Sequence, residues 1–438
     1  MAILTKDEAR RIFEKVMSYS KADECESNLN GNIGGNIRYA RNTVTTSGMQ
    51  NDMTLVAQSS YGKKTGTATI NEFDDASLEK VVRRSEELAK LAPENPEYVN
   101  FLEPQKYLES KAYFDATAKI TPEYRAQAAL NSIQPSRAKN LVAAGFFQDG
   151  AGFQAKINSK GLLAYHQQTN VNFSVTVRTT DGTGSGYVTR DYNDVTKLDT
   201  GAASQIAIAK AELSKNPVAI EPGKYTVILE PAASIDLLQN MIFNFNARQA
   251  DEGRSFMAKA GGGTKLGEKI VDERVTIYSD PTHPDVPAVC WAGDGRPFEK
   301  TVWIEKGVVK NLFYQRYWAQ KKGVKATPPP ANGIVEGGTA TVADMIRDTL
   351  KGVLVTRLWY IRTVDPQTLL YTGLTRDGLF YIENDKIKHA IKNFRFNESP
   401  VIMLNNLETL GKPVRINGSL VPPMKIRDFT FTSLSDAV

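Results

Sequence analysis

The chain has very few cysteines and histidines. Cys25 and Cys290 are its only cysteines among 438 residues, and they lie far apart in sequence. One chain can therefore build neither a disulfide framework nor a thiolate zinc cluster, and reduced thiols are expected. The histidines His166, His283 and His389 lie in separate segments. No pair stands at the helical spacing of a zinc hydrolase, so each is interpreted as a surface or hydrogen-bonded side chain.

Long apolar runs and blocks of one charge are also missing. No run approaches the roughly eighteen apolar residues of a membrane-spanning helix, so we expect no membrane association. The 54 basic and 49 acidic side chains are interspersed, and the net charge of +5 forms no basic surface for nucleic acid. The first residues lack the basic and apolar segments of a secretory signal, which predicts a cytoplasmic location.

Several catalytic patterns are absent. There is no GxSxG elbow for a serine hydrolase. Cys290 lies in the apolar stretch PAVCW, which favours a buried and unreactive thiol over a nucleophile. The glycine-rich stretch 261–269 has Glu268 where a phosphate-binding lysine belongs, so a flexible loop is the better interpretation. An enzyme working through carboxylates such as Asp251 and Asp272 stays open, although neither shows a partner for acid–base work.

The first half alternates helices with groups of strands. Thr5 and Glu8 form a capping box for a first helix, and short alternating segments between residues 36 and 70 predict an antiparallel meander. Further helices are expected after Asp74, after Thr121-Pro122 as far as Leu130, and over 200–213. Between 140 and 188, strands are predicted with turns at Asp149-Gly150, Ser159–Gly161 and Asp181-Gly182.

One segment organises the second half. Tyr225–Leu229 alternates like a strand, and Pro231 stands where the first turn of a helix accepts proline. The apolar face expected for this helix comprises Ile235, Leu238, Met241, Ile242 and Phe245. The amides of Gln239, Asn240 and Asn244 fall largely on its other faces. Such a helix is either an ordinary surface helix or the wall of a cleft.

Hairpins dominate the remainder. Residues 302–314 and 380–391 each predict two strands joined by a two-residue turn, and Asp377-Gly378 is interpreted as a further turn. Thr341 and Asp344 predict a short capped helix before the strand 353–361. The long irregular stretches 260–267 and 321–338 are expected to be binding loops or mobile covers.

These patterns predict an α+β fold in two parts. Asn216-Pro217 breaks the helix over 200–213, so we place the boundary there. Residues 1–217 form an N-terminal α+β region, and residues 218–438 form a β-rich domain that carries the amide-bearing helix.

The order of several phrases resembles one family. The helix NEFDDASLEKVVRRSEELAKLAPENP is followed by EPGKYTVILEPAASIDLL, EGRSF, VTIYSDP, RPFEKTVWIEKGVVKNLFYQRYWA and LYTGLTRDGLFYIENDKIKHAIKNFRFNESP. This order, over essentially the whole chain, is similar to that of the TldD/PmbA family, also called modulators of DNA gyrase. The resemblance implies a β-rich C-terminal domain that packs as a dimer around a cleft.

The resemblance also implies a chemistry that this chain lacks. TldD-type members carry HExxxH on the helix after the LEP strand and a cysteine near the C-terminus. Aligned on LEPAA, that motif falls on Gln239, Asn240 and Asn244, and the cysteine region falls on 415–419, which holds no cysteine. Neutral amides do not replace zinc ligands. The chain therefore looks like a PmbA/TldE-type member that binds no metal and no other cofactor.

The implied function is that of a pseudoenzyme subunit. PmbA/TldE-type members pair with a TldD-type zinc peptidase that cleaves unfolded or precursor peptides, which predicts a peptide partner and a heterodimer. The cleft is predicted to include Arg254, Ser255, Phe256, Tyr317 and Trp318. For Tyr317 and Trp318 the other interpretation is core packing of a hairpin. The alternative function is an independent homodimeric peptide-binding or chaperone-like protein without hydrolytic activity.

Overall fold

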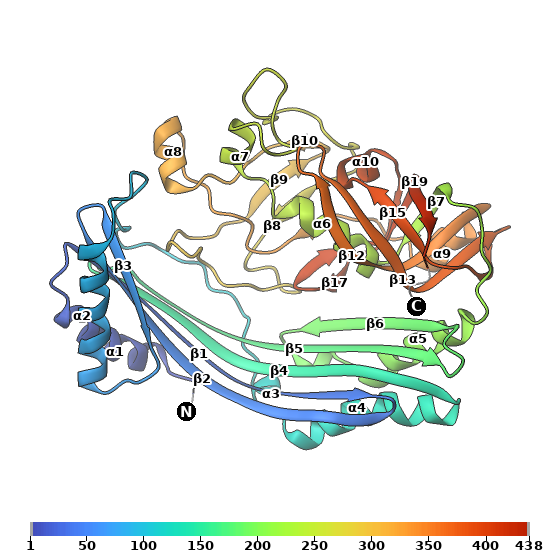
Figure 1. The fold of residues 1–438 in the computed structure, drawn as a ribbon, viewed down its shortest axis with the longest axis horizontal. Coiled ribbons are helices and arrows are strands. Elements are labelled where there is room, and N and C mark those ends of the chain that lie inside the picture. Colours follow the sequence, from blue (N-terminus) through green and yellow to red (C-terminus); the bar gives the residue numbers. More distant parts are fainter. Residues whose placement is uncertain (1–2, 436–438) are drawn as a thin grey trace.

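A computed structural model describes residues 3–435 and confirms the α+β class. Figure 1 shows two stacked parts: a long curved sheet with helices on its outer side, and above it a β-rich part built from the second half of the chain. In the described range no helix has the length and apolar character needed to span a membrane.

The first part is one antiparallel sheet of six strands in the order β3-β2-β1-β4-β5-β6. The strands are β1 (Glu24–Ala40), β2 (Thr43–Tyr61), β3 (Lys64–Ile70), β4 (Leu141–Asn158), β5 (Leu163–Thr179) and β6 (Ser185–Tyr192). The helices are α1 (Lys6–Tyr19), α2 (Asp75–Leu91), α3 (Asp115–Ala118), α4 (Pro122–Ala138), the 3₁₀ turn η1 (Val195–Lys197) and α5 (Thr200–Leu213). The apolar face of the sheet packs on α1, α2, α4 and α5, and its polar face looks toward the second part.

Local sequence signals correctly predicted where most of these helices begin. The capping box between Thr5 and Glu8 is confirmed, as are the caps at Asp74 and Thr121. The helix after Thr121 runs past its predicted end at Leu130 to Ala138, with Pro135 inside it. Helix α2 packs closely on β3 at Gly66, where glycine has no side chain. A Cβ at this position would lie only 2.2 Å from the Ser85 carbonyl oxygen of α2.

One predicted turn of the first part is wrong. Asp149-Gly150 lies inside β4, opposite Gly35 and Gly34 of β1, whereas the turns at Ser159–Gly161 and Asp181-Gly182 are confirmed. Asp149 is buried beneath the sheet, where Arg125 of α4 donates to its Oδ1 at 2.6 Å and to its Oδ2 at 2.9 Å. The Asp149 carboxylate therefore joins α4 to the sheet, and the chain does not reverse direction at this position.

The second part contains a closed ring of five strands: β7 (Gly223–Leu229), β12 (Lys351–Asp365), β13 (Leu370–Glu383), β15 (Phe394–Glu398) and β19 (Met424–Leu434). The order β12-β7-β19-β15-β13 closes on itself because β13 also pairs with β12. The strands β14 (Lys386–Ala390) and β16 (Leu407–Leu410) extend its rim. Closure leaves no free edge along the ring.

A second sheet lies beside the ring, in the order β10-β9-β8-β11-β18-β17. Its strands are β8 (Ile277–Ser279), β9 (Thr301–Glu305), β10 (Val308–Val309), β11 (Ile334–Val335), β17 (Val414–Ile416) and β18 (Ser419–Val421). The helices of this part are α6 (Pro231–Ile242), α7 (Ala247–Asp251), α8 (Arg316–Lys322), α9 (Val342–Arg347) and α10 (Pro400–Asn405). The predicted hairpins with turns at Lys306-Gly307 and Asn384-Asp385 are confirmed, as is the capping box at Thr341.

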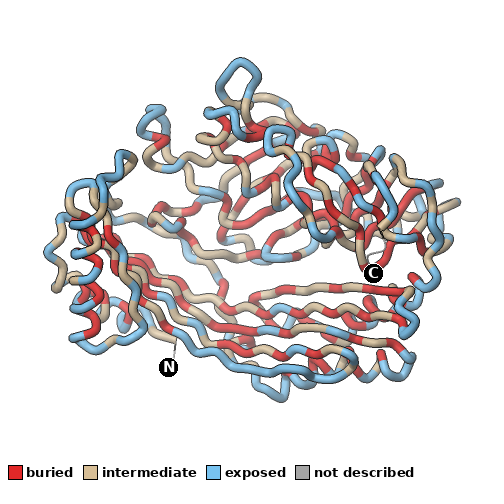
Figure 2. Tube along the Cα trace, in the orientation of Figure 1, coloured by how far each residue is buried: buried red, intermediate tan, exposed pale blue. Residues whose placement is uncertain are grey.

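The largest core lies where α6 meets the ring and the second sheet. Figure 2 shows buried stretches concentrated there and alternating with more exposed ones along the strands of the first sheet. The ring and the second sheet of the second part therefore both pack against α6.

Candidate functional site: helix α6 and the cavity at its first turn

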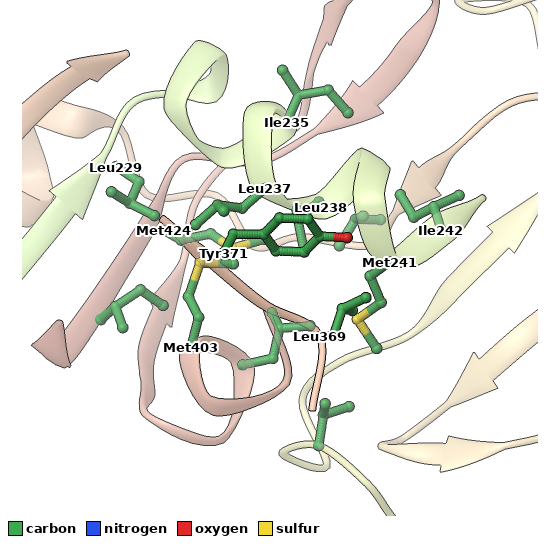
Figure 3. Packing of buried hydrophobic residues seen from close by; sticks show 14 of the residues in the cluster. Leu229, Ile235, Leu237, Leu238, Met241, Ile242, Leu369, Tyr371, Met403 and Met424 are labelled. Atoms are coloured by element: carbon green, nitrogen blue, oxygen red, sulfur yellow. The ribbon is translucent and has the colours of Figure 1, made fainter. Parts of the chain in front are cut away.

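Helix α6 is anchored by apolar side chains on one face. It follows β7 directly, with Pro231 in its first turn as predicted. Ile235, Leu238 and Met241 are buried in the main core, and Figure 3 shows Tyr371 beside Leu238 and near Met241, with Ile235 on the other side of the helix. Complete burial of such side chains contributes roughly 2 kcal/mol each, which fixes the rotation of the helix and so the direction of its polar face.

The helix ends earlier than the sequence predicted. It stops at Ile242, so Asn244 and Phe245 lie beyond it, and the expected stripe through Phe245 is wrong. Phe245 is nevertheless buried, because the chain turns and stacks its ring on Trp303 at a centroid distance of 5.8 Å. Periodicity identified the buried residue correctly but could not show that a turn, and not a helix, delivers it to the core.

The three amide positions lie at the C-terminal end of α6. Gln239 is exposed, and Asn240 and Asn244 are partly exposed. The Asn240 amide donates to the Asp236 carbonyl oxygen at 2.9 Å, and the Asn244 amide donates to the Asn240 carbonyl oxygen at 2.5 Å. These two side chains therefore satisfy carbonyl groups of the helix and the turn after it.

This donor set does not fit a catalytic zinc. A zinc peptidase site uses imidazole, carboxylate or thiolate ligands, and amide side chains are not among them. Within residues 3–435, no three His, Cys, Asp or Glu side chains gather closely enough to hold a metal ion. The amide positions therefore supply no ligand set for a catalytic zinc.

One carboxylate shares the polar side of α6. Asp236 Oδ2 accepts a hydrogen bond of 3.0 Å from the backbone N–H of Leu358 in β12. Burial raises the pKa of Asp236 to about 7, and the Leu358 N–H and the charge of Arg357 oppose that rise only in part. A carboxyl with such a pKa can exchange a proton near neutral pH, but within residues 3–435 Asp236 forms no ion pair, and Arg357 acts on it only through its charge.

A cavity opens at the other end of α6. It has a volume of about 540 Å³ and lies between the two parts of the molecule. Its walls come from β6, α5, the first turn of α6 and β17, and include Arg190, Lys210, Glu230, Thr356 and Arg415. Asn240 is nine residues from Pro231, which separates it from this cavity by about 13 Å along the helix axis.

Ion pairs connect the walls of this cavity. Lys210 of α5 pairs with Glu230, the residue that precedes α6. Arg415 Nε lies 3.0 Å from Asp191 Oδ2 of β6, so the region predicted to replace the family's cysteine, 415–419, contacts the first sheet. The Thr356 hydroxyl is buried without a hydrogen-bond partner among the described residues. The cavity thus has a polar wall that both parts of the molecule build.

Sequence reasoning missed a buried charged cluster beside this cavity. Asp377 is fully buried, and its Oδ2 lies 2.8 Å from Arg357 Nε and 3.8 Å from Arg376 Nε. The Ser185 hydroxyl of β6 donates to Asp377 Oδ1 at 2.6 Å, and the Arg357 guanidinium stacks on the Tyr187 ring at 3.9 Å. The predicted turn at Asp377-Gly378 is instead an irregularity inside β13, with both residues at positive φ.

The five residues predicted to line a peptide cleft lie away from this cavity. Phe256 is 2% exposed in the main core, and Ser255 is buried beside it. Arg254 is exposed and pairs with Glu252. The Trp318 indole N–H donates to Asp251 Oδ2 at 2.7 Å from a buried position, while its neighbour Tyr317 is partly exposed. Their part in a peptide cleft stays a prediction.

Comparison with protein families gave two matches. The model described as the PmbA/TldA metallopeptidase central domain matches residues 110–215, and the C-terminal domain model of the same family matches residues 222–433. Together they cover more than half of the chain.

Curated relatives come from archaea. An uncharacterized protein of Methanocaldococcus jannaschii is 28% identical over 275 residues, and a metalloprotease of Methanothermobacter thermautotrophicus is 22% identical over 301 residues. Each match covers 62% of this chain and 62% of the relative, so the similarity spans less than two thirds of their length.

Solved structures share the fold over nearly the whole chain. TldE from Thermococcus kodakarensis superposes with a TM-score of 0.84 at 19% identity, covering 97% of this chain and 99% of that one. A Thermotoga maritima protein described as a modulator of a DNA gyrase gives 0.87 at 16% identity, with 97% and 100% covered. At these identities the likeness shows the fold alone.

Proposed function

Since the chain belongs to the PmbA/TldA metallopeptidase family, the TldD/PmbA family of the sequence resemblance, we propose that it is a metal-free subunit of a peptidase complex. In this proposal a zinc-bearing chain of the same family cleaves unfolded or precursor peptides, and the present chain helps to form the cleft that holds them. The observation that carries the proposal is the set of amides Gln239, Asn240 and Asn244 where the resemblance places zinc ligands.

The hydrogen bonds of these amides support the same interpretation. Asn240 and Asn244 donate to backbone carbonyl oxygens at the end of α6. The position thus has a structural use that a metal ligand could not fulfil at the same time. The fold around it is complete, because the apolar face of α6 is fully packed. A subunit that keeps the fold of the family and lacks the zinc ligands is suited to binding and positioning a peptide.

An exposed apolar strand supports association with a partner. Trp359, Tyr360 and Val364 of β12 are 43%, 59% and 54% exposed, although β12 belongs to the closed ring. Phe243, just after α6, is exposed as well. Clustered exposed apolar side chains commonly mark protein interfaces. We assign this patch, Trp359–Val364, to contact with the zinc-bearing chain.

Metal content and hydrolysis together test the proposal. The purified chain is expected to contain no stoichiometric zinc and to leave an unfolded test peptide intact. The same peptide should be cleaved when a TldD-type chain with an intact HExxxH motif is added. Stoichiometric zinc together with chelator-sensitive hydrolysis by the chain alone would overturn the proposal. Pull-down that recovers only the chain itself would favour the homodimeric peptide-binding protein instead.

A further inference from the structure

The polar face of the first sheet carries a row of side-chain amides. Asn28, Asn30 and Asn32 alternate along β1, and Gln154 of β4 pairs with Asn30 across the two strands. Gln168 of β5 continues the row beyond Gly152 of β4. Because side chains on one face of a strand recur every second residue, all of these amides lie on the face opposite α1 and α2.

Two hollows lie over this row. The first, of about 320 Å³, is lined by Asn30, Asn32, Gln154 and Gln168. The second, of about 360 Å³, shares Asn30 and Gln154 with the first and is also lined by Trp291, Phe298, Pro329 and Pro330. They adjoin at the shared residues, and together we name them the amide groove. Its floor comes from the first part of the molecule, and one wall comes from the second.

The floor of the amide groove offers hydrogen bonds that the protein itself does not use. Among the described residues, the side chains of Asn30, Asn32 and Gln154 make no hydrogen bond, and Asn30 and Asn32 are exposed. Each amide supplies two donors and one acceptor oxygen. A Cβ on Gly150 would lie 3.1 Å from the amide oxygens of both Asn32 and Asn170, so glycine leaves room for these side chains.

The wall of the groove is aromatic and held in place. The Trp291 ring lies 5.5 Å from the Tyr107 ring and meets His166 edge-on at 6.0 Å. Tyr107 also donates its hydroxyl to the Gly295 carbonyl oxygen at 2.7 Å. Lys156, the basic residue of the groove, is buried and paired with Glu26. Asp52 of β2, an exposed carboxylate that accepts a hydrogen bond from Gln50, lines the first hollow as well. The groove therefore combines side-chain amides and one carboxylate with an ordered apolar wall.

The spacing of the amides matches one kind of ligand. Residues two apart on a strand are about 6.7 Å apart, and an extended polypeptide repeats its same-side N–H and C=O groups at the same interval. We propose that the amide groove binds an extended polypeptide segment through its main chain, with apolar side chains against Trp291 and the prolines. This proposal rests on the proposed function and names where the unfolded substrate is held.

The sheet supplies a matched control for testing this site. Asn36 and Gln148 pair across β1 and β4 as Asn30 and Gln154 do, but they line neither hollow. The probe is a fluorescein-labelled ten-residue peptide of Ser, Val and Ala, and binding to the full chain is measured by fluorescence anisotropy. The double variant Asn30→Ala/Gln154→Ala is expected to bind about tenfold or more weakly, and Asn36→Ala/Gln148→Ala as tightly as the unchanged chain.

Two modified peptides test whether binding uses the peptide main chain and where on the protein it occurs. The same peptide with N-methyl groups on alternate residues lacks half of its main-chain donors and should bind at least about tenfold more weakly. A benzoylphenylalanine version should cross-link to residues 28–32, 152–156 or 289–298. Equal binding by both double variants, or cross-links confined to the cavity at Arg190 and Arg415, would contradict peptide binding in the amide groove. Either result would leave the proposed subunit role intact.

The remaining outcomes separate the groove from the subunit role. Failure of the unchanged chain to bind the peptide, with normal stimulation of a zinc-bearing partner, would overturn the groove alone. Failure of both peptide binding and stimulation of the zinc-bearing partner would overturn the proposed function as well. Binding of a malto-oligosaccharide that the peptide cannot displace would assign the amides to sugar recognition and would also overturn the proposal.

Discussion

The Oδ2 atom of Asp377 lies 2.8 Å from Nε of Arg357, at the point where the ring of strands meets the first sheet. The carboxylate also accepts the hydroxyl hydrogen of Ser185 from β6, and Arg357 stacks on Tyr187 of the same strand. The two residues of this ion pair come from β12 and β13. Their contacts with β6 therefore help to hold the two parts of the molecule together.

Replacement of Asp377 should be costly for stability. Asp377→Asn leaves Arg357 and Arg376 without their buried counter-charge, and breaking such a pair typically costs about 3 kcal/mol. Urea unfolding followed by circular dichroism measures the loss. Glu87→Gln is the control, because it breaks an exposed pair with Arg84 and should cost less than about 1 kcal/mol. Equal effects of the two substitutions would contradict a structural role for the cluster.

The raised pKa of Asp236 predicts a pH dependence. An unfolded aspartate titrates near pH ~3.9, whereas burial raises the folded pKa to about 7. Between these values the folded chain holds the proton more strongly, so its stability falls as pH rises from about 4 to 7 and then levels off. Asp236→Asn, which keeps an acceptor for Leu358, should remove this part of the slope. An unchanged slope in urea unfolding at pH 5, 6, 7 and 8 would show that Asp236 does not titrate there.

The exposed patch Trp359–Val364 should govern association. Tyr360→Asp places a charge on a side chain that is 59% exposed, so folding should be unaffected while binding to the zinc-bearing chain weakens at least about tenfold. Leu91→Asp, at an 82% exposed position on α2, is the matched control and should bind normally. Titration calorimetry gives the affinities. Normal binding by both variants would place the interface elsewhere.

Much of the fold could be predicted because its signals are local. Thr5, Asp74, Thr121 and Thr341 cap helices where the sequence placed them, since a side-chain cap depends only on neighbours within one turn. Burial of Cys290 also followed from its apolar neighbours, and burial raises its pKa to about 11. The same reasoning misplaced the end of α6, which depends on how Phe245 stacks on Trp303.

The site was harder to predict because its parts are distant in sequence. Asp149-Gly150 and Asp377-Gly378 have the composition of turns, yet both lie within long strands, where their carboxylates meet Arg125 and Arg357. An Asp-Gly pair inside an alternating stretch also fits a bulge, which is the signal that Asp377-Gly378 offered, whereas Asp149-Gly150 lies in regular register with both neighbouring strands. The alternating asparagines of β1 were visible in the sequence as well, but only the register with β4 and the wall at Trp291 makes them a groove.

In the proposed complex this chain supplies peptide binding and another chain supplies the zinc. The most direct test of this division of roles is a titration in which a fixed amount of a TldD-type chain with HExxxH receives increasing amounts of this chain. The rate of peptide hydrolysis is expected to rise and to level off at one added chain per zinc-bearing chain, with zinc found only on the latter. Hydrolysis that grows in proportion to this chain without a TldD-type chain present, and that stops when zinc is removed from this chain, would contradict this division of roles.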